Sequence, residues 1–170
     1  MPFALELDVV DGTSGAALVE TSTDGLTFAA PVAFGSSIPF FPEPGDGLRT
    51  AWARVTDAAG LTGDARSLEV FVDTTSPRGG FTFASGTSTG SPAVTLQLSA
   101  IDDASGPWTV ELSNDGADWS APAAVAPTLD WVLEDSDGEK EVHLRLADRA
   151  GNAVVLLRSV TLDTDPPSGT

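Results

Sequence analysis

Aspartate is the residue type in this chain with the most capacity for chemistry, because its carboxylates gather in several turn-rich segments. Asp73 lies in a stretch of Thr, Ser and Pro, and Asp102, Asp103 and Asp148 lie in segments that contain Gly. If the strands between these segments run alternately up and down, all three segments lie at one end of the same fold. Hard cations such as calcium take about 6–8 oxygen ligands. These four carboxylates, with the Asn152 carbonyl oxygen, therefore predict a calcium site at the junction between two domains.

A simpler interpretation is that each aspartate only builds its own turn, by accepting backbone N–H bonds. The spacing of the five residues does not match an EF-hand loop, so the metal prediction depends on folding to bring them together. Without a cation, carboxylates this close would repel one another and splay the domains. Both interpretations stay open, and calcium would be expected to bind with a Kd of roughly 10⁻⁴–10⁻³ M.

Catalytic chemistry has little to draw on in this sequence. The single histidine, His143, is predicted on the solvent face of a strand beside Glu141 and Arg145. No serine lies in a Gly-x-Ser-x-Gly motif, and no second histidine can serve as a triad base. Arg54 and Arg145 are interpreted as ion-pair partners on strand surfaces. Because no set of catalytic roles can be assembled, we expect a protein that is not an enzyme.

The composition excludes several classes of partner. A formal net charge of −17 argues against nucleic acid and against anionic membrane surfaces, which both require clustered Lys and Arg. Cysteine is absent, so disulfides do not stabilise the fold. No apolar run approaches the ~18 residues of a membrane span, so no membrane insertion is expected. The first residues also lack the features of a signal peptide. We therefore expect either that the protein is not secreted by that route or that the sequence is a fragment with an added Met.

The chain contains an internal repeat. Residues 1–60, shifted forward by 91 positions, align without a gap with residues 92–151. The same residue recurs at matched positions such as Asp11 and Asp102, Gly25 and Gly116, Arg54 and Arg145, and Asp57 and Asp148. A repeat of this period indicates two copies of one folding unit.

Apolar and polar residues alternate with period two between Asn/Asp–Gly turn signals, a pattern typical of antiparallel strands. The second copy is predicted to contain seven strands, near residues 81–84, 94–101, 108–113, 118–120, 129–133, 140–147 and 153–163. The first copy supplies only six, because its sequence begins at the residue that matches Pro92. The missing strand would leave an edge or a core groove open, unless a partner or a preceding segment fills it.

These patterns predict an all-β fold of two tandem antiparallel β-sandwich domains. The first domain is expected at 1–73, a linker at 74–77, the second domain at 78–163, and the start of a further linker or tail at 164–170. The stretch Asp163–Pro167 repeats the linker Asp73–Pro77, so both ends are expected to be cuts through a longer array.

Strand parity predicts where the aromatic side chains point. Trp108 shares parity with buried positions and is expected in the core or at an edge. Trp52 aligns with His143 on the outward face, where it could anchor a protein or a sugar ring, or be covered by a neighbouring loop. Four further aromatic residues are predicted to be core: Phe28, Phe40, Trp119 and Trp131.

Residues 94–152 resemble the Ig-like repeats of large bacterial surface and secreted proteins. The resemblance rests on an opening motif at Leu96–Gly106, a middle motif at Val110–Trp119, a closing D-x-A-G-N motif within Asp137–Asn152, and a linker motif at Asp73–Pro77. The first copy departs from this pattern, with Leu61 where Asn152 lies.

The resemblance implies two tandem Ig-like or fibronectin-like domains in an extracellular or cell-surface protein that forms a rod and is often adhesive. Its expected partner is a protein or glycan surface, or neighbouring copies in an assembly. Inter-domain calcium sites that stiffen the rod occur in similar adhesin repeats. Two alternatives stay open. One is a virion structural protein, such as a capsid decoration or tail component, and the other is a non-catalytic accessory module of a secreted polysaccharide-acting enzyme.

Overall fold

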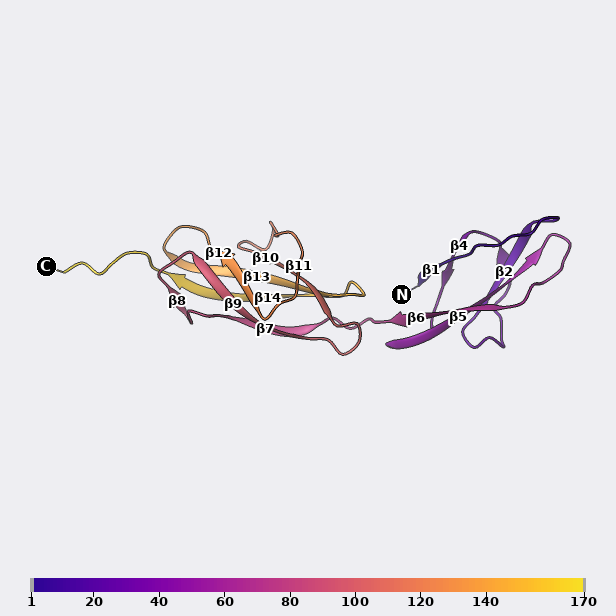
Figure 1. The fold of residues 1–170 in the computed structure, drawn as a ribbon, viewed down its shortest axis with the longest axis horizontal. Coiled ribbons are helices and arrows are strands. Elements are labelled where there is room, and N and C mark those ends of the chain that lie inside the picture. The colour runs from indigo at the N-terminus through magenta and orange to yellow at the C-terminus, as the bar shows by residue number, and fades with distance from the viewer. Residues whose placement is uncertain (1, 170) are drawn as a thin grey trace. The chain divides into compact units, whose positions relative to one another are not determined.

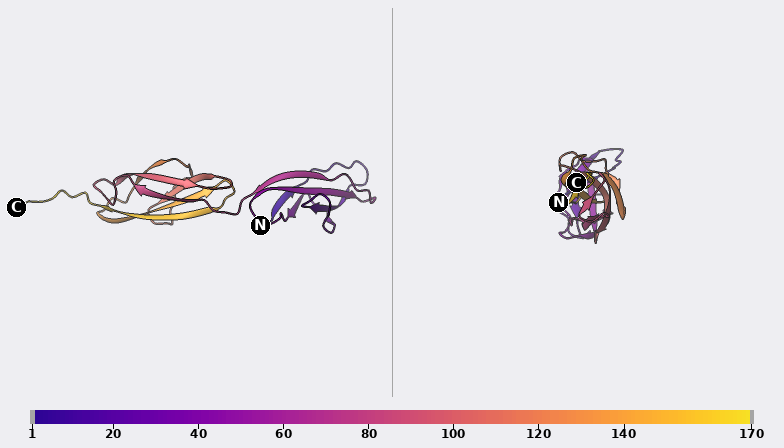
Figure 2. Two further views of the ribbon diagram at one scale, coloured as in Figure 1. Left: turned by 90° about the horizontal axis from the view of Figure 1, so that it is seen from below. Right: turned by 90° about the vertical axis from the view of Figure 1, so that its left-hand side faces the viewer.

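The computed structural model describes residues 2–169, and the regular structure within them consists of β-strands (Figure 1). The chain divides into two compact units, Met1–Val72 and Asp73–Thr170. In each unit the strands form two sheets that face one another (Figure 2). The predicted all-β sandwich class is therefore confirmed. No helix within residues 2–169 is long and apolar enough to cross a membrane.

The second unit pairs a five-stranded sheet with a three-stranded one. It contains β7 (Arg78–Phe83), β8 (Ser88–Thr89), β9 (Ala93–Ile101), β10 (Pro107–Ser113), β11 (Ala123–Ala124), β12 (Thr128–Val132), β13 (Gly138–Asp148) and β14 (Ala153–Leu162). The larger sheet has the order β11-β10-β13-β14-β8, and the smaller has the order β12-β9-β7. All neighbours in these sheets are antiparallel except β14 and β8.

Alternation along the strands builds the core of the second unit. Val142, Leu144 and Leu146 of β13 are 0 % exposed, and they pack with Leu96 of β9 between the sheets. Burial of one such side chain contributes roughly 1.5–3 kcal/mol. Trp131 is partly buried against this cluster, in keeping with its predicted core position.

The first unit has the same plan with fewer strands. It contains β1 (Phe3–Glu6), β2 (Ala16–Ser22), β3 (Val32–Ala33), β4 (Ser37–Phe40), β5 (Gly47–Asp57) and β6 (Arg66–Val72), arranged as a β3-β2-β5-β6 sheet and a β1-β4 sheet. Its core is smaller, with buried Leu5, Val19, Ile38, Phe40 and Ala51. Phe40 is 2 % exposed, which confirms its predicted place in the core.

The predicted strand at 118–120 is wrong. The short strand of this region is β11, at Ala123–Ala124. Asp115 Oδ1 accepts the N–H groups of Ala117 and Asp118 at 2.8 and 2.9 Å, so these donors belong to a turn and not to a sheet ladder. The two-residue strand β8 was not predicted, because it is too short to show alternation.

A Ser-x-Asp-Gly turn follows β2 in the first unit and β10 in the second. Ser22 Oγ donates to Asp24 Oδ1 at 2.8 Å, and the same oxygen accepts the Thr27 N–H at 2.8 Å. Hydrogen bonds to its carboxylate lower the pKa of Asp24 to about 2, and the bond from the Thr27 N–H has the largest effect. In the second unit the Asp118 N–H leads the bonds that lower the pKa of Asp115 to about 2.

Acidification is expected to destabilise both units through these turns. A carboxylate with a depressed folded pKa contributes stability that is complete above its unfolded pKa of about 3.9 and is lost as the pH falls through about 2. The Tm of the wild type should therefore fall as the pH is lowered from about 4 to about 2. In the double variant Asp24→Asn, Asp115→Asn the Tm should fall less over this range, because the two turns carry no carboxylate to be protonated. Equal falls in Tm with pH for the two proteins would contradict the prediction.

Candidate metal centre

Three carboxylates come together at the end of the second unit where its chain enters. Asp73 is the first residue of the unit, Asp102 directly follows β9, and Asp148 is the last residue of β13. One carboxylate oxygen of each lies within 4.8 Å of the other two. Asp73 and Asp148 are only 8 % and 3 % exposed, and Asp102 is half-buried. Negative charge gathered with so little water around it favours a cation among the oxygens.

Backbone N–H groups hold two of these carboxylates in place. Asp102 Oδ1 accepts from Ala104 N and Gly106 N at 3.0 and 2.8 Å. Gly106 adopts φ +78°, a conformation that glycine reaches without strain. Asp73 Oδ2 accepts from Ser105 N at 3.0 Å, which ties the start of the unit to this loop.

Asn152 joins the Asp148 carboxylate to the backbone at Asp73. Its backbone N–H donates to Asp148 Oδ1 at 2.9 Å, and its Nδ2 donates to Asp148 Oδ2 at 2.8 Å. The same Nδ2 donates to the Asp73 carbonyl oxygen at 3.1 Å. The closing D-x-A-G-N motif therefore fixes the third carboxylate to the chain at Asp73.

Two polar atoms of this cluster are buried without a hydrogen-bond partner among residues 2–169, Asp102 Oδ2 and Ser105 Oγ. An unpartnered buried polar atom costs roughly 1–3 kcal/mol, and more when it is charged. Both atoms belong to the loop that faces Asp73, and both are oxygens. Both are atoms that a cation bound at this loop could satisfy.

The first unit provides a comparison in which a hydroxyl group lies between the two matching carboxylates. Asp11 and Asp57 match Asp102 and Asp148, and Ser14 Oγ lies within hydrogen-bond distance of both, at 3.1 and 2.9 Å. No counterpart of Asp73 exists within residues 2–72, because the repeat begins after that position. Two carboxylates with a hydroxyl between them therefore replace the three carboxylates of the second unit.

The predicted ligand set is brought together in part. Asp73, Asp102 and Asp148 meet within the second unit, and Asn152 contacts two of them. Asp103 does not join them, because its exposed side chain forms an ion pair with Arg78. The Asn152 carbonyl oxygen accepts the Asp148 N–H at 3.0 Å. Sequence reasoning missed Ser105, although its match with Ser14 across the repeat could have drawn attention to it.

The donor chemistry favours calcium over other metals. The three carboxylates and the Ser105 hydroxyl are hard oxygen ligands, and no His or Cys lies in the cluster. Calcium tolerates irregular coordination by about 6–8 oxygens, with water completing the shell. The arrangement suits a structural ion, because it joins three chain segments at one end of the sandwich.

Trp52, the predicted contact residue, lies half-buried on the outer face of β5. Its ring packs on the turn at Gly25, where a Cβ atom would approach the ring to 2.8 Å. The second unit repeats this arrangement with His143 against Gly116, at 3.1 Å. The turn therefore covers part of the Trp52 ring, and a role for the rest in binding stays a prediction.

The core prediction for Phe28 and Trp119 is wrong. Both rings lie on the outer face, with the guanidinium carbon of Arg54 and of Arg145 4.1 Å from the respective ring centroid. Each ring follows a capped turn instead of lying on a strand, so strand parity does not apply to it. The outer-face placement stabilises the arginines by cation–π contact.

The two arginines are ion-paired on strand surfaces, as predicted. Arg54 Nε lies 2.8 Å from Glu20 Oε2, and Arg145 Nη1 lies 3.0 Å from Glu111 Oε2. The Arg54 guanidinium lowers the pKa of Glu20 by hydrogen bonding.

Trp108 does not lie in the core, which was one of the two places predicted for it. Its side chain is 52 % exposed, and the Arg149 guanidinium lies 4.5 Å from its ring centroid. The register of β10 against β13 shifts between Pro107 and Thr109, so a β-bulge at Trp108 breaks the alternation on which the prediction depended.

No family model and no curated protein matches this sequence. Solved structures do resemble the fold. The fibronectin(III)-like modules of CbhA from Clostridium thermocellum align over 91 % of this chain and 80 % of theirs, with 16 % identity and a TM-score of 0.58. At this identity the likeness concerns the fold alone, and it shows a fibronectin-like β-sandwich.

Two further structures align less closely. The PKD1 domain of Vibrio anguillarum Epp aligns over 55 % of this chain and 100 % of its own, with 14 % identity and a TM-score of 0.43. The D00–D0 domain of intimin aligns over 96 % of this chain and 92 % of its own, with 15 % identity and a TM-score of 0.36.

Proposed function

We propose that this chain is a non-catalytic structural module of an extracellular or cell-surface repeat protein, a spacer that presents a binding surface. The observation that carries this proposal is that the chain enters and leaves the second unit at opposite ends (Figure 1). Units connected in this way continue in one direction, which is what a spacer requires.

The hydrogen bonds of the second unit define its two ends. At the first end Asp73 contacts the loops after β9 and β13. At the other end Thr164 donates to Asp137 Oδ1 at 2.9 Å, and Asp163 N donates to the Thr89 carbonyl oxygen at 3.0 Å. Between the ends runs β13, whose eleven residues span about 36 Å.

The chemistry of the surface supports a role without catalysis. His143 is packed against the Gly116 turn and the edge of the Trp119 ring, with Glu141 3.8 Å away. None of these three neighbours offers a hydroxyl or thiol that a histidine base could activate. The net charge of −17 supports solubility of a long, exposed protein.

In this proposal a calcium ion braces the second unit where its chain enters. The ion would bind Asp73, Asp102 and Asp148 and would satisfy the buried oxygens of Asp102 and Ser105. It would thereby fix the connecting segment to two loops of the sandwich. A fixed connection limits bending between successive modules, which a spacer needs in order to hold its binding surface at a distance.

Small-angle X-ray scattering on the whole chain tests the spacer role. If successive units continue in one direction, as the proposal requires, two strand lengths of about 36 Å should give a maximum dimension of at least roughly 70 Å. Calcium at 10 mM should narrow the distribution of dimensions relative to chelator, because the connecting segment loses freedom. A maximum dimension near that of one unit's length, in either condition, would show the units folded side by side and would contradict a spacer.

A further inference from the structure

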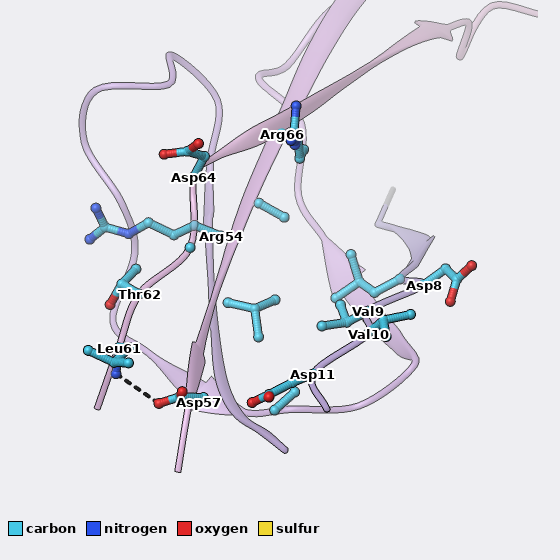
Figure 3. Close-up of a pocket in the computed structure, with 15 residues that line it drawn as sticks. Asp8, Val9, Val10, Asp11, Arg54, Asp57, Leu61, Thr62, Asp64 and Arg66 are labelled. Atoms are coloured by element: carbon cyan, nitrogen blue, oxygen red, sulfur yellow. Dashed lines mark hydrogen bonds between the residues drawn. The ribbon is translucent and has the colours of Figure 1, made fainter. Parts of the chain in front are cut away.

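Two pockets of the first unit lie at opposite edges of its small sheet. The pocket beside the end of β1, of about 480 Å³, has walls from residues 7–11, 53–57 and 61–66 (Figure 3). In the second unit the matches of residues 7–10 pair with β7, and no strand within residues 2–72 takes that position. The other pocket, of about 390 Å³, lies at the end of β4 and is called the β4 pocket here.

The β4 pocket lies where the edges of the two sheets meet. Thr21 near the end of β2 is paired with Ala53, which packs against the core, so the Thr21 side chain points between the sheets. Phe40, the last residue of β4, is 2 % exposed and belongs to the same core. The remaining walls come from the turn after β2, the segment that follows this turn and the residue after β4: Ser22, Thr23, Asp24, Thr27, Phe28, Ala29 and Phe41.

In the second unit larger side chains close the same corner. Leu112 and Trp131 take the places of Thr21 and Phe40. Trp131 Nε1 donates to Asn114 Oδ1 at 2.7 Å, and Asn114 Nδ2 donates at 3.1 Å to the carbonyl oxygen of the residue after Trp131. The Asn114 amide therefore joins the turn after β10 to β12, and this bridge links the edges of the two sheets.

The residue that matches Asn114 in the first unit is Thr23, and it makes a different bond. Thr23 Oγ1 donates to Glu43 Oε1 at 3.3 Å. A hydroxyl group that donates its proton keeps lone pairs as acceptors. The first unit therefore offers an acceptor where the second unit binds an indole N–H, and it has the smaller phenyl ring where the second unit has the indole.

The β4 pocket does not depend on the segment that precedes β9 in the second unit. The matches of its residues all lie between 112 and 132, outside β7 and the loop after it. Val132, the match of Phe41, is 63 % exposed although that loop is present, and Phe41 is 68 % exposed. The opening results from the side chains at Thr21, Thr23 and Phe40.

The lining of the β4 pocket favours an uncharged ring as its ligand. Phe28, Phe40 and Phe41 contribute aromatic groups, which pack well with another ring in offset or edge-to-face arrangements. Asp24 is the charged member of the described lining, and its Oδ1 already accepts three hydrogen bonds within its own turn. The volume lies within the range of roughly 300–1,000 Å³ that small-molecule sites occupy.

We propose that the β4 pocket binds an aromatic ring that carries an N–H donor, as an indole does. The ring would pack beside Thr21 and Phe40, and its N–H would donate to Thr23 Oγ1. Two sources carry this chemistry, a free indole compound and the Trp side chain of a partner polypeptide. The site gives the first unit a ligand of its own and is independent of the spacer role, which scattering tests separately.

Titration of the full chain with indole, followed by its backbone amide NMR signals, tests the site. The signals of residues 21–29 and 40–41 should shift, while those of 112–120 and 131–132 should stay in place, because the second unit is closed by its own indole. Indene has the same shape without the N–H and should bind roughly fivefold more weakly. Absence of shifts, equal shifts in the two units, or equal affinities for indole and indene would overturn the proposal.

N-acetyl-tryptophanamide distinguishes the two sources of the ring. Binding at least as tight as that of indole would assign the pocket to a Trp side chain, because the attached backbone groups then fit outside it. Binding of indole alone would assign the pocket to a free small molecule. If neither compound binds, the pocket is not an indole site.

Exchange of side chains between the two copies tests the geometry. The variant Thr23→Asn, Phe40→Trp gives the first unit the closing pair of the second and should abolish the indole-induced shifts. Thr21→Leu also copies the second unit and should weaken indole binding about tenfold, because the added side chain takes up part of the pocket. Thr50→Leu, on the face of β5 that points away from the core, should bind as the wild type does. Wild-type affinity in either corner variant, with the NMR spectrum of a folded first unit, would overturn the site.

Discussion

Leu144→Ala is expected to lower the free energy of unfolding of the second unit by about 2–5 kcal/mol. Leu144 lies in the middle of β13 with 0 % exposure, inside a cluster that both sheets contribute. Removing its side chain loses the transfer free energy and leaves a cavity that paired strands on both sides prevent from collapsing. For a unit of this size, each kcal/mol lowers the Tm by roughly 4–8 °C.

A matched variant shows whether burial is the cause. Leu157 lies on β14 directly opposite His143, loses the same atoms on replacement with Ala, and is 43 % exposed. Leu157→Ala should cost less than about 1 kcal/mol. Urea unfolding followed by a signal from the second unit, such as Trp131 fluorescence, measures both. Comparable losses for the two variants would contradict the proposed core.

The success of the strand prediction has a plain physical cause. In β9 and β13 one face is buried and the other is more exposed, so apolar and polar residues alternate along the strand. This alternation can be recognised in the sequence. Because the chain contains two copies of the unit, the same pattern can be recognised twice. The prediction failed at 118–120, where Asp115 caps the backbone and local hydrogen bonds decide the conformation.

Parity predicts direction only where an unbroken strand exists. Phe40 and Trp131 lie on strands and point inward as predicted. Trp108 lies at a bulge, and Phe28 and Trp119 lie beyond the strands, so the period carries no information about them. These three rings instead contact arginines on the surface.

The part of the carboxylate cluster that depends on strand topology could be predicted from the sequence. Alternating strands bring the loops after β9 and β13 to one end, which is why Asp73, Asp102 and Asp148 meet. Topology does not say which of two adjacent loop residues faces inward, and Asp103 pairs with Arg78 instead. The unpartnered oxygens of Asp102 and Ser105 depend on side-chain rotamers, which no spacing in the sequence encodes.

Calcium is expected to stabilise the second unit and to leave the first unit unchanged. With a Kd of roughly 10⁻⁴–10⁻³ M, 10 mM calcium should add about 1.4–2.7 kcal/mol to its free energy of unfolding. This should raise the Tm of the second unit by roughly 6–20 °C over the value in chelator. Differential scanning calorimetry in both conditions measures the shift, with magnesium at the same concentration as a comparison for ionic strength.

Asp102→Asn separates a metal site from a set of turns. The amide keeps an oxygen for the Ala104 and Gly106 N–H groups and replaces the unpartnered Oδ2 with an uncharged NH₂ group. In chelator the variant should therefore be at least as stable as the wild type, because one of three clustered charges is gone. In calcium it should gain little, since a ligand is lost. Asp11→Asn, at the matched place in the first unit, should keep the full calcium response. If the aspartates only build turns, Asp102→Asn and the wild type will respond to calcium alike, and the metal proposal fails.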